Sequence, residues 1–556
     1  RLERFGHKMK SISLKDVTVL GNLSHRLLLN CMRLESDIYL PEAVCRLDGG
    51  GWPADAEGRT LLAQIRQMES TGREPSYLRQ ILRKVYGNFN TKGYLGRILP
   101  PGQFDEQQLS GHNWLLRALL EYYRITGSQE AAAAAEKMVR SLYLPLSGAY
   151  KRYPLKPEER VFEGRPDGEL TGDCINGWYL STDIGCAYMC LDGLSRAYRI
   201  LHISELKGLL EEMIQEFSNI DFVGISMQTH ATLSAVRGIL CFYETERNSE
   251  TLEVAKRIFS LYQNQGMTQN YANYNWFGRP FWTEPCAIVD SFMAAMDLYR
   301  FTEDIKYFET AQKIYLNALS HGQRSNGGFG LDNCTGGEQL FLTAAGDGGD
   351  AYWCCSMRGG EGLAEVARSI GMEKDGILHI GFYNPAELKL PDGTLEICTD
   401  YPLEGRVFLR LNGCLPSNQL ALFIPEYAEC FQIKVNDCEV SSVKENGFAK
   451  ITVPSNAVIE LVFDIPLLVE QADKPFRQGY FTLSHGFQML GVSSSKVHEV
   501  NPSALHMVKP GIYEGSGVTL RPITDSYKLN QESMLAERLQ ILFQKPFNAE
   551  KDVVNR

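Results

Sequence analysis

Residues 113–127, NWLLRALLEYYRITG, run directly into residues 128–143, SQEAAAAAEKMVRSLY. The first stretch places its apolar side chains at the i, i+3, i+4 and i+7 spacing of one helix face. Gly127 follows the last turn and suits a helix C-cap, because glycine adopts left-handed backbone angles without strain. The second stretch begins another helix at once. Together they predict a helical hairpin, and this unit decides the fold class.

Helical spacing recurs from about residue 21 to residue 370. Examples are TLLAQIRQMESTG, DIGCAYMCLDGLSRAYRIL, ATLSAVRGILCFYETE, AIVDSFMAAMDLYRFTED and IKYFETAQKIYLNALSHG. Several of these helices end alike, in an apolar residue, a polar step and a turn, as at Ile125-Thr126-Gly127 and Phe301-Thr302-Glu303. Such a repeat predicts either a closed ring of six hairpins, an (α/α)6 barrel, or an open solenoid. Periodicity alone does not choose between them, and we expect the barrel over 21–370.

The apolar spacing changes to period two after Gly371, as in ILHIGFY, RVFLRL, QLALFIP and VIELVFDI, with Asn-Gly, Asp-Gly and Asn-Asp turns between the runs. This pattern predicts an antiparallel β-sandwich over 371–470. We expect a second β-rich region with a C-terminal strap over 471–556, and an N-terminal strand within 1–20 that packs on a β-domain. The predicted class is therefore multidomain α+β, an (α/α)6 barrel followed by C-terminal antiparallel β-sandwich domains.

Composition narrows the classes of partner. The 556 residues are too many for one hydrophobic core, and the net charge of -11 argues against nucleic acid and anionic membranes. No apolar run reaches the roughly 18 residues that span a bilayer, and residues 1–17 show no signal-peptide core. The 14 cysteines are scattered, which favours free thiols in a reducing, cytoplasmic setting. The oligomeric state stays open, with a homodimer as one candidate.

Long loops rich in glycine, aromatic residues and aspartate separate the predicted hairpins. Examples are NTKGYLGRILPPGQFDEQQLSGHNW, VFEGRPDGELTGDC, NYANYNWFGRPFWTEPC and NGGFGLDNCTGGEQLFLTAAGDGGDAYWCC. Loops of this length usually carry function. Aromatic rings that cover sugar faces, with carboxylates and amides that bind hydroxyls, are typical of carbohydrate sites.

Four residues in two of these loops have the chemistry of a metal site. Glu284-Pro-Cys286 precedes Cys354-Cys355 by about seventy positions, and three thiols with one carboxylate suit a tetrahedral Zn²⁺. Adjacent cysteines on a helix point about 100° apart, so both reach one ion only from an extended or turn backbone. Buried free cysteines and a vicinal disulfide are the alternatives, and a reducing compartment disfavours the disulfide.

Taken together, the chain resembles the glycoside hydrolase family 127 superfamily, known for β-L-arabinofuranosidases. The resemblance covers most of the sequence and rests above all on Glu-x-Cys followed by Cys-Cys. Weaker motifs support it: SLKDVTVLGNL, GYLG, GHNWLLRALLEYYRITG, THATLSAVRG, TEPCAIVDS, YWCC before a helix, KVND and GYFTLSHG.

The resemblance implies a zinc-dependent, retaining glycosidase that acts on plant-type or related glycans. It implies that one Zn²⁺ is bound by Glu284, Cys286, Cys354 and Cys355, and that Cys354 attacks the anomeric carbon. The substrate is then an oligosaccharide or glycoside. By the same resemblance and by loop position, we expect the sugar to contact His230, His112, Trp276, Arg279, Trp282 and Asp183, although Trp114 falls nearer the family's position than His112.

One element of the family is missing. Characterised members place a glutamate, the general acid/base, in a Gly-rich loop shortly before Glu-x-Cys, but no Asp or Glu occurs here between Glu253 and Glu284. Either the proton donor comes from elsewhere, or the chemistry differs. The loop before Cys354 offers carboxylates, and the Gly266 loop offers two phenols, which are poorer acids because of their pKa near 10. The candidates are Glu338, Asp332, Asp347, Asp350, Tyr271 and Tyr274.

Two other functions fit the same pattern. An (α/α)6-barrel polysaccharide lyase would eliminate across a uronic acid and would need only Tyr or His as base. A non-catalytic sugar-binding protein would keep the zinc as a structural ion. The retention of Cys354 argues mildly against the sugar-binding protein, because structural zinc sites are usually fully coordinated and unreactive.

Overall fold

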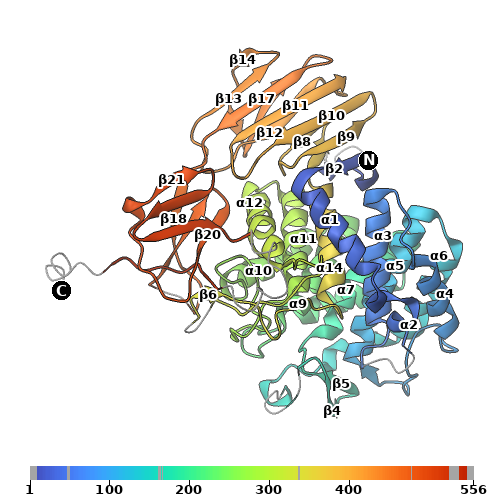
Figure 1. Cartoon of the computed structure of the whole chain (residues 1–556). Helices are drawn as coiled ribbons and strands as arrows, with labels where there is room; N and C mark the ends of the chain where they lie inside the picture. Colours follow the sequence, from blue (N-terminus) through green and yellow to red (C-terminus); the bar gives the residue numbers. More distant parts are fainter. Residues whose placement is uncertain are drawn as a thin grey trace.

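The computed structural model of the chain describes residues 9–46, 51–160, 165, 167–335, 339–476, 479–524 and 538–546. Six helices form an inner ring, and each packs on the next. The last of them packs on the first, so the ring is closed and the predicted (α/α)6 barrel is confirmed over the open solenoid (Figure 1). In ring order they are α3 (Asp55–Thr71), α5 (Glu106–Thr126), α7 (Cys190–Leu201), α9 (Thr229–Glu246), α11 (Pro285–Thr302) and α14 (Cys355–Arg368).

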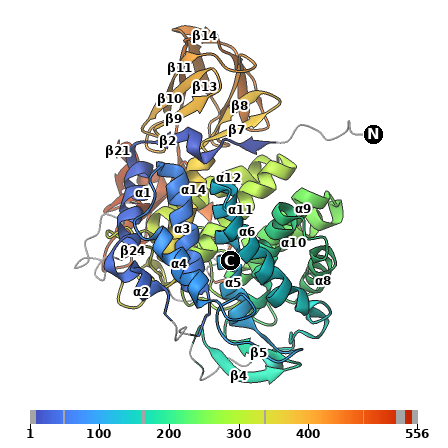
Figure 2. The same cartoon turned by 90° about the vertical axis from the view of Figure 1, so that its right-hand side faces the viewer.

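Each inner helix is backed by an outer helix, and Figure 2 shows the helical domain turned by 90°. The first outer helix, α1 (Gly21–Leu34), packs on α14, so the start of the chain completes the last pair. The others pack on the inner helix that precedes them: α4 (Leu78–Asn88), α6 (Gln129–Met138), α8 (Leu206–Ser218), α10 (Ser249–Gln265) and α12 (Ile305–Ile314).

The hairpin of α5 and α6 shows how the sequence sets these elements. The Asp105 carboxylate caps α5 by accepting hydrogen bonds from the backbone N–H groups of Gln107 and Gln108. Gly127 ends α5 with φ 73°, and the Ser128 hydroxyl then accepts from the Ala131 N–H at the start of α6. Inner helices are buried along most of their length, as in α5, α9 and α11, whereas the outer helices bury one face.

Glycine allows the inner helices to approach closely at two crossings. A Cβ atom at Gly58 of α3 would lie 2.2 Å from the backbone N of Leu115 in α5. A Cβ atom at Gly238 of α9 would lie 2.4 Å from the backbone C of Leu191 in α7. Any larger residue would force these helices apart, so the two glycines fix the width of the ring.

The two ends of the barrel differ. Because all six inner helices run the same way, their N-termini gather at one end, with a small sheet of β3 (Phe104–Asp105), β5 (Trp178–Ser181) and β4 (Leu170–Ile175). The C-terminus of α14 leads straight into the β-sandwich at the other end, the upper end in Figure 1.

Two sheets form the sandwich. One has the order β1 (Lys10–Ser11), β7 (Gly371–Lys374), β8 (Ile377–Ile380), β12 (Gln419–Phe423), β16 (Phe448–Thr452) and β15 (Lys444–Glu445). The other has the order β14 (Cys438–Val440), β13 (Phe431–Val435), β17 (Val458–Phe463), β11 (Arg406–Gly413), β10 (Gly393–Thr399), β9 (Ala386–Leu390) and β2 (Val17–Val19).

The N-terminal strands join both sheets, with Lys10 opposite Glu373 and Val17 opposite Leu388. The pairing is antiparallel except between β8 and β12, where Leu378 lies opposite Leu420. The chain crosses to the other sheet between these two strands, so no hairpin forces them to be antiparallel.

A third sheet holds β18 (Leu467–Gln471), β19 (Phe481–His485), β20 (Gln488–Ser493), β23 (Val518–Pro522), β22 (Ile512–Gly515) and β21 (His506–Lys509). The short strand β24 (Leu539–Gln540) pairs with β20 and also with β6 (Phe341–Leu342). Since β6 belongs to the loop before Cys354, the C-terminal module anchors that loop. Most of the predicted C-terminal strap lies outside the described residues.

In the part of the chain that the structure describes, no helix combines the length and the apolar character needed to cross a membrane.

Candidate metal and active site

The four predicted metal ligands meet at the N-terminal ends of α11 and α14. Glu284 is the N-cap residue of α11 and Cys286 lies in its first turn, while Cys354 is the N-cap residue of α14 and Cys355 its first residue. Their ligand atoms all lie within 4.8 Å of one another. The Cys355 Sγ lies 3.6 Å from the Cys286 Sγ and 3.2 Å from the Cys354 Sγ.

The backbone at the paired cysteines explains how both reach one point. Cys354 has φ −149° and ψ −61°, outside the helical region, and α14 begins only at Cys355. Neighbouring residues on a helix would point about 100° apart. Because only one of the pair is helical, both sulfurs turn toward Cys286.

The arrangement fits a tetrahedral metal ion. Zinc–sulfur bonds of about 2.3 Å would hold tetrahedral sulfurs about 3.8 Å apart, close to the separations between these thiols. Two helix N-termini point at the cluster, and helix N-termini stabilise anions such as thiolates. The cluster can therefore hold a metal ion, with three soft sulfur donors and one oxygen donor.

The three thiols differ in environment. Hydrogen bonds from Cys286 and Cys355 lower the pKa of Cys354 to about 6, whereas burial raises the pKa of Cys286 to about 11 and that of Cys355 well above its usual range. Arg59 also donates to the Cys286 Sγ at 3.3 Å. Cys286 and Cys355 are fully buried, but Cys354 is partly exposed and lines a large cavity. Cys354 is thus the thiol placed to meet a ligand.

Glu284 is held on every side. His230 Nδ1 lies 3.2 Å from its Oε1, and the amide of Asn275, oriented to satisfy its neighbours, donates to Oε2 at 2.7 Å. The backbone N–H of Glu284 donates to Asn273 Oδ1 at 2.8 Å. These contacts leave the carboxylate little freedom to rotate away from the thiols.

His230 lies below the cluster with its ring stacked on Trp114, 5.6 Å between centroids. Its Nε2 lies 3.2 Å from Asp290 Oδ2, so both ring nitrogens face carboxylates. Burial alone would lower the pKa of His230, but Glu284 and Asp290 outweigh it and raise the pKa to about 9. With 1% of its surface exposed, His230 is buried between these two carboxylates.

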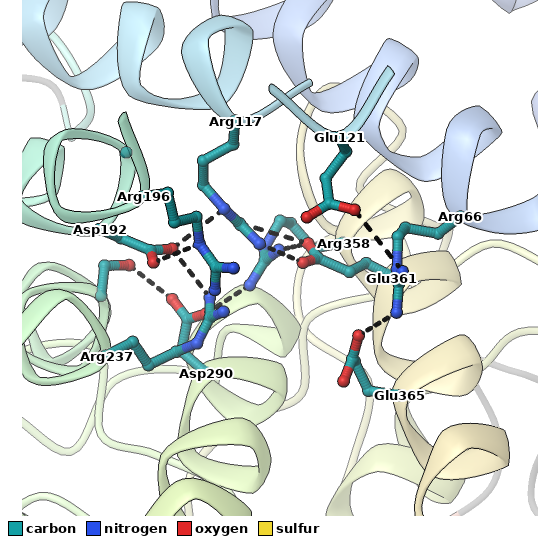
Figure 3. Close-up of polar contacts among 12 residues, drawn as sticks. Arg66, Arg117, Glu121, Asp192, Arg196, Arg237, Asp290, Arg358, Glu361 and Glu365 are labelled. Carbon is teal, nitrogen blue, oxygen red and sulfur yellow. Dashed lines mark hydrogen bonds and ion pairs between the residues drawn. The ribbon is translucent and has the colours of Figure 1, made fainter. Parts of the chain in front are cut away.

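An ion-pair network inside the barrel supports this histidine (Figure 3). Asp290 accepts from Ser234 at 2.5 Å, from Arg237 at 2.9 Å and from Arg358. The network continues through buried or largely buried partners on neighbouring inner helices, which are Arg117, Asp192, Arg196 and Glu361. A second group of ion pairs, Arg66 with Glu121 and Glu365, lies beside it in Figure 3. Arginines of the same region also cover Trp114, with the Arg59 and Arg358 guanidinium carbons 4.3 and 4.6 Å from the indole centroid.

The cavity that Cys354 faces has a volume of about 1010 Å³. Ligand pockets usually span about 300–1,000 Å³, so this one is large enough for more than a single sugar. One part is aromatic and open, since Tyr352 and Trp353 are 43% and 56% exposed. Among the described residues, the cavity lining has three arginines and six carboxylates. The carboxylates are Asp55, Glu57, Asp167, Glu169, Asp183 and Glu284.

The predicted sugar contacts fall into two groups. Asp183, His230, Trp276 and Trp282 all line the cavity. Arg279 is not among the lining residues, although its guanidinium carbon lies 6.0 Å from the Trp276 ring centroid.

His112, which was expected to contact the sugar, is not among the described residues that line the cavity. Its Nε2 accepts from the Leu95 N–H at 2.9 Å and its Nδ1 lies 2.7 Å from the Gln108 carbonyl oxygen. Burial lowers its pKa to about 4. Both ring nitrogens thus contact backbone groups where α5 meets the GYLG loop, and neither is left to bind another group.

The acids expected in the loop before Cys354 are engaged elsewhere. Asp350 pairs with Arg33 at 2.9 Å and accepts from Ser356, and Asp332 pairs with Arg324 at 2.8 Å. Asp347 is exposed and accepts from the Gly349 N–H in a tight turn. None of the three lines the cavity, and Glu338 lies outside the described residues.

The two phenols are also elsewhere. Burial raises the pKa of Tyr271 to about 12, and Tyr274 is fully buried with its ring against Phe476. Neither lines the cavity. Sequence reasoning missed Glu57 and the exposed Tyr352 and Trp353. The sequence pointed only to Tyr352 and Trp353 as possible site residues, because they directly precede the cysteine pair.

The fold matches solved glycoside hydrolases along nearly the whole chain. A GH127 β-arabinofuranosidase has a TM-score of 0.71 at 13% identity, covering 97% of this chain and 98% of its own. A GH127 β-L-arabinofuranosidase from Geobacillus stearothermophilus T6 has a TM-score of 0.67 at 13% identity, covering 95% and 100%. Another glycoside hydrolase has a TM-score of 0.68 at 14% identity, covering 97% and 98%.

No family model and no curated protein matches the chain in sequence. At these identities the structural matches show the fold. The resemblance to the GH127 superfamily drawn from the sequence is confirmed at that level.

Proposed function

We propose that the protein is a zinc-dependent, retaining glycoside hydrolase whose nucleophile is Cys354. The observation that carries the proposal is the convergence of Glu284, Cys286, Cys354 and Cys355, with Cys354 alone among the thiols lining the cavity. Zn²⁺ bound by these four residues would hold the sulfurs deprotonated at neutral pH. The GH127 fold makes β-L-arabinofuranosides the first substrates to test.

The chemistry follows from the position of Cys354. Its Sγ forms a bond to the anomeric carbon while the bond from that carbon to the glycosidic oxygen breaks. Water then displaces the sulfur from the face that the leaving group occupied, so two inversions give net retention. The partly exposed Trp282 supplies a ring face for the sugar, and the acidic lining supplies acceptors for its hydroxyls.

The charge of the cavity favours a neutral sugar. Asp55 pairs with Arg59 at 2.9 Å and Arg97 with Asp105 at 3.1 Å, so two of the three lining arginines already have partners. The remaining carboxylates would repel a polyuronate, which counts against the lyase alternative. A partly exposed thiol in a large cavity likewise counts against a purely structural zinc. All 14 cysteines are unpaired, which supports a reducing location such as the cytoplasm.

Metal analysis combined with turnover tests the proposal. The wild-type protein and Cys354→Ser are compared, with Cys438→Ser, an exposed thiol on β14, as control. We expect one zinc per chain in the wild type, hydrolysis of an activated aryl β-L-arabinofuranoside or a related glycoside with retained configuration, and loss of turnover in Cys354→Ser alone. Full activity in Cys354→Ser rules out the nucleophile. Release of an unsaturated product from polyuronate would favour the lyase.

A further inference from the structure

A retaining glycosidase needs a group that protonates the departing oxygen and later takes a proton from water. Of the expected acids that the structure describes, Asp332, Asp347 and Asp350 all lie outside the cavity. Within the described part of the chain, the candidates are therefore the carboxylates that line the cavity together with Cys354.

Asp183 is fixed in place by its backbone. Its N–H donates to Ser181 Oγ at 3.2 Å, and the next residue, Ile184, accepts at 3.1 Å from the N–H of Gln228. Gln228 is the N-cap residue of α9, two positions before His230. The backbone next to Asp183 is thus hydrogen-bonded to the start of α9, the helix that carries His230. The side chain of Asp183 lines the same cavity as Cys354.

The carboxylate of Asp183 differs from its neighbours in having no hydrogen-bond donor or cation paired with it among the described residues. Asp55 is paired with Arg59, and Glu284 is held by His230 and Asn275. An acid/base must be able to exchange protons with substrate and water, so a carboxyl group without a fixed partner suits that role.

Charges on every adjoining element act on this group. Burial, together with Glu284 of α11, Asp167 of the neighbouring loop and Glu106 of α5, raises the pKa of Asp183 to about 7, against the lowering effect of His230 of α9. A carboxyl group that is protonated near neutral pH can donate, and its conjugate base can accept.

We infer that Asp183 is the general acid/base of the reaction proposed above, and this assignment rests on that proposal. In the first step its carboxyl proton passes to the glycosidic oxygen as the bond from that oxygen to the anomeric carbon breaks and the sulfur bond to Cys354 forms. In the second step its carboxylate takes a proton from water while the water oxygen bonds to the anomeric carbon. The carbon–sulfur bond breaks as this carbon–oxygen bond forms, and both Cys354 and Asp183 return to their starting forms.

Glu57 is the rival. It lines the cavity, and burial raises its pKa to about 7 as well. Its charged neighbours, however, are Asp55 and Cys45, whereas those of Asp183 include Glu284 and His230. Glu57 therefore lies toward Cys45, and Asp183 lies on the side of the thiol cluster.

The test compares Asp183→Asn, Asp183→Ala and Glu57→Gln with the wild type on two glycosides of the same sugar. One has a nitrophenyl leaving group and the other a sugar or alkyl leaving group. We expect Asp183→Asn to lose about 10²–10⁴-fold in kcat/KM on the alkyl or sugar glycoside. On the nitrophenyl glycoside it should show a burst followed by slow turnover, because that leaving group needs no proton but hydrolysis of the intermediate still needs a base.

Rescue by azide distinguishes a catalytic role of Asp183 from a structural one. It should restore turnover of the nitrophenyl glycoside by Asp183→Ala and give a glycosyl azide of retained configuration, with zinc content unchanged. If Asp183→Asn hydrolyses both glycosides at wild-type rates, the assignment of Asp183 is overturned and the proposed function stands. The same holds if the burst appears in Glu57→Gln and not in Asp183→Asn. A wild type inert on all glycosides overturns the proposed function and this assignment together.

Discussion

The Nδ1 atom of His230 lies 3.2 Å from Oε1 of Glu284, and Asp290 holds the other ring nitrogen. This pair fixes the carboxylate of the proposed metal site through a residue that is not itself one of the proposed ligands. His230→Phe should keep the stacking on Trp114 but remove both contacts. We expect zinc affinity to fall by about 10–100-fold, as is usual when the partner of a metal ligand is lost. Competition with a chromogenic chelator measures this directly.

His506→Gln is the matched control, because His506 is exposed on β21, far from the barrel interior in sequence and fold. Its zinc affinity should equal that of the wild type. Equal affinity in His230→Phe would show that Glu284 needs no support from His230.

Asp290 is the acceptor on which the buried network converges. Asp290→Asn would leave Arg237 and Arg358 without their shared carboxylate in the barrel interior. Breaking a buried ion pair by removing one partner costs about 3–5 kcal/mol. The variant should therefore melt at a clearly lower temperature, whereas Glu136→Gln, in an exposed pair with Arg140, should not. A melting temperature unchanged in Asp290→Asn would mean that the network adds no net stability.

The helices were predictable because their apolar faces are local signals. The stretch that ends at Gly127 forms α5, and the one that follows forms α6. Closure of the ring was not predictable from periodicity, because it depends on contacts between α3 and α14, almost three hundred residues apart. The parallel pairing of β8 and β12 escaped prediction for the same reason, since alternation does not encode strand direction.

The cluster of three thiols and a carboxylate could be predicted because its members carry distinctive chemistry in two short motifs. The proposed acid/base could not, because the sequence around a loop carboxylate does not show which cation pairs with it. Asp350 is captured by Arg33, more than three hundred residues away, and only the fold brings that arginine near. Asp183 was expected as a sugar contact, and its lack of a cationic partner appears only when the neighbouring helices are in place.

Trp353 offers a broad apolar face beside Cys354, the proposed nucleophile. Its side chain is 56% exposed at the cavity, one residue before Cys354. If a substrate group stacks there, Trp353→Ala loses about 1–2 kcal/mol of apolar contact. KM for an oligosaccharide should then rise about tenfold, while kcat changes little. Steady-state kinetics measure this, with Phe408→Ala on β11 as an exposed aromatic control outside the cavity. A selective fall in kcat would instead place Trp353 in the chemical step.

Glu57 should make stability depend on pH. Burial raises its pKa from 4.5 to about 7, so the folded state holds this proton more tightly than the unfolded state. The resulting stabilisation is complete below about pH 4.5 and is lost as the pH rises through about 7. Glu57→Gln does not titrate, so it should melt higher than the wild type at pH 8, with the gap narrowing toward pH 4. Melting curves across this range measure the gap, and a constant gap contradicts the assignment.

Substitutions at two glycines can distinguish the effect of ring packing on stability from the effect of helix propensity. A Cβ atom at Gly238 of the inner helix α9 would lie 2.4 Å from the Leu191 backbone, whereas a Cβ atom at Gly208 of the outer helix α8 would meet nothing within 4 Å. Gly238→Ala should therefore destabilise the barrel by about 1–3 kcal/mol or more, because overpacking forces the backbone to shift. Gly208→Ala should stabilise it by up to about 1 kcal/mol through helix propensity. Denaturant melts followed by circular dichroism compare the two, and the opposite signs are the expected result. Equal stabilisation by both alanines would mean that α7 and α9 do not touch at this crossing, and the ring would have to be wider than the structure has it.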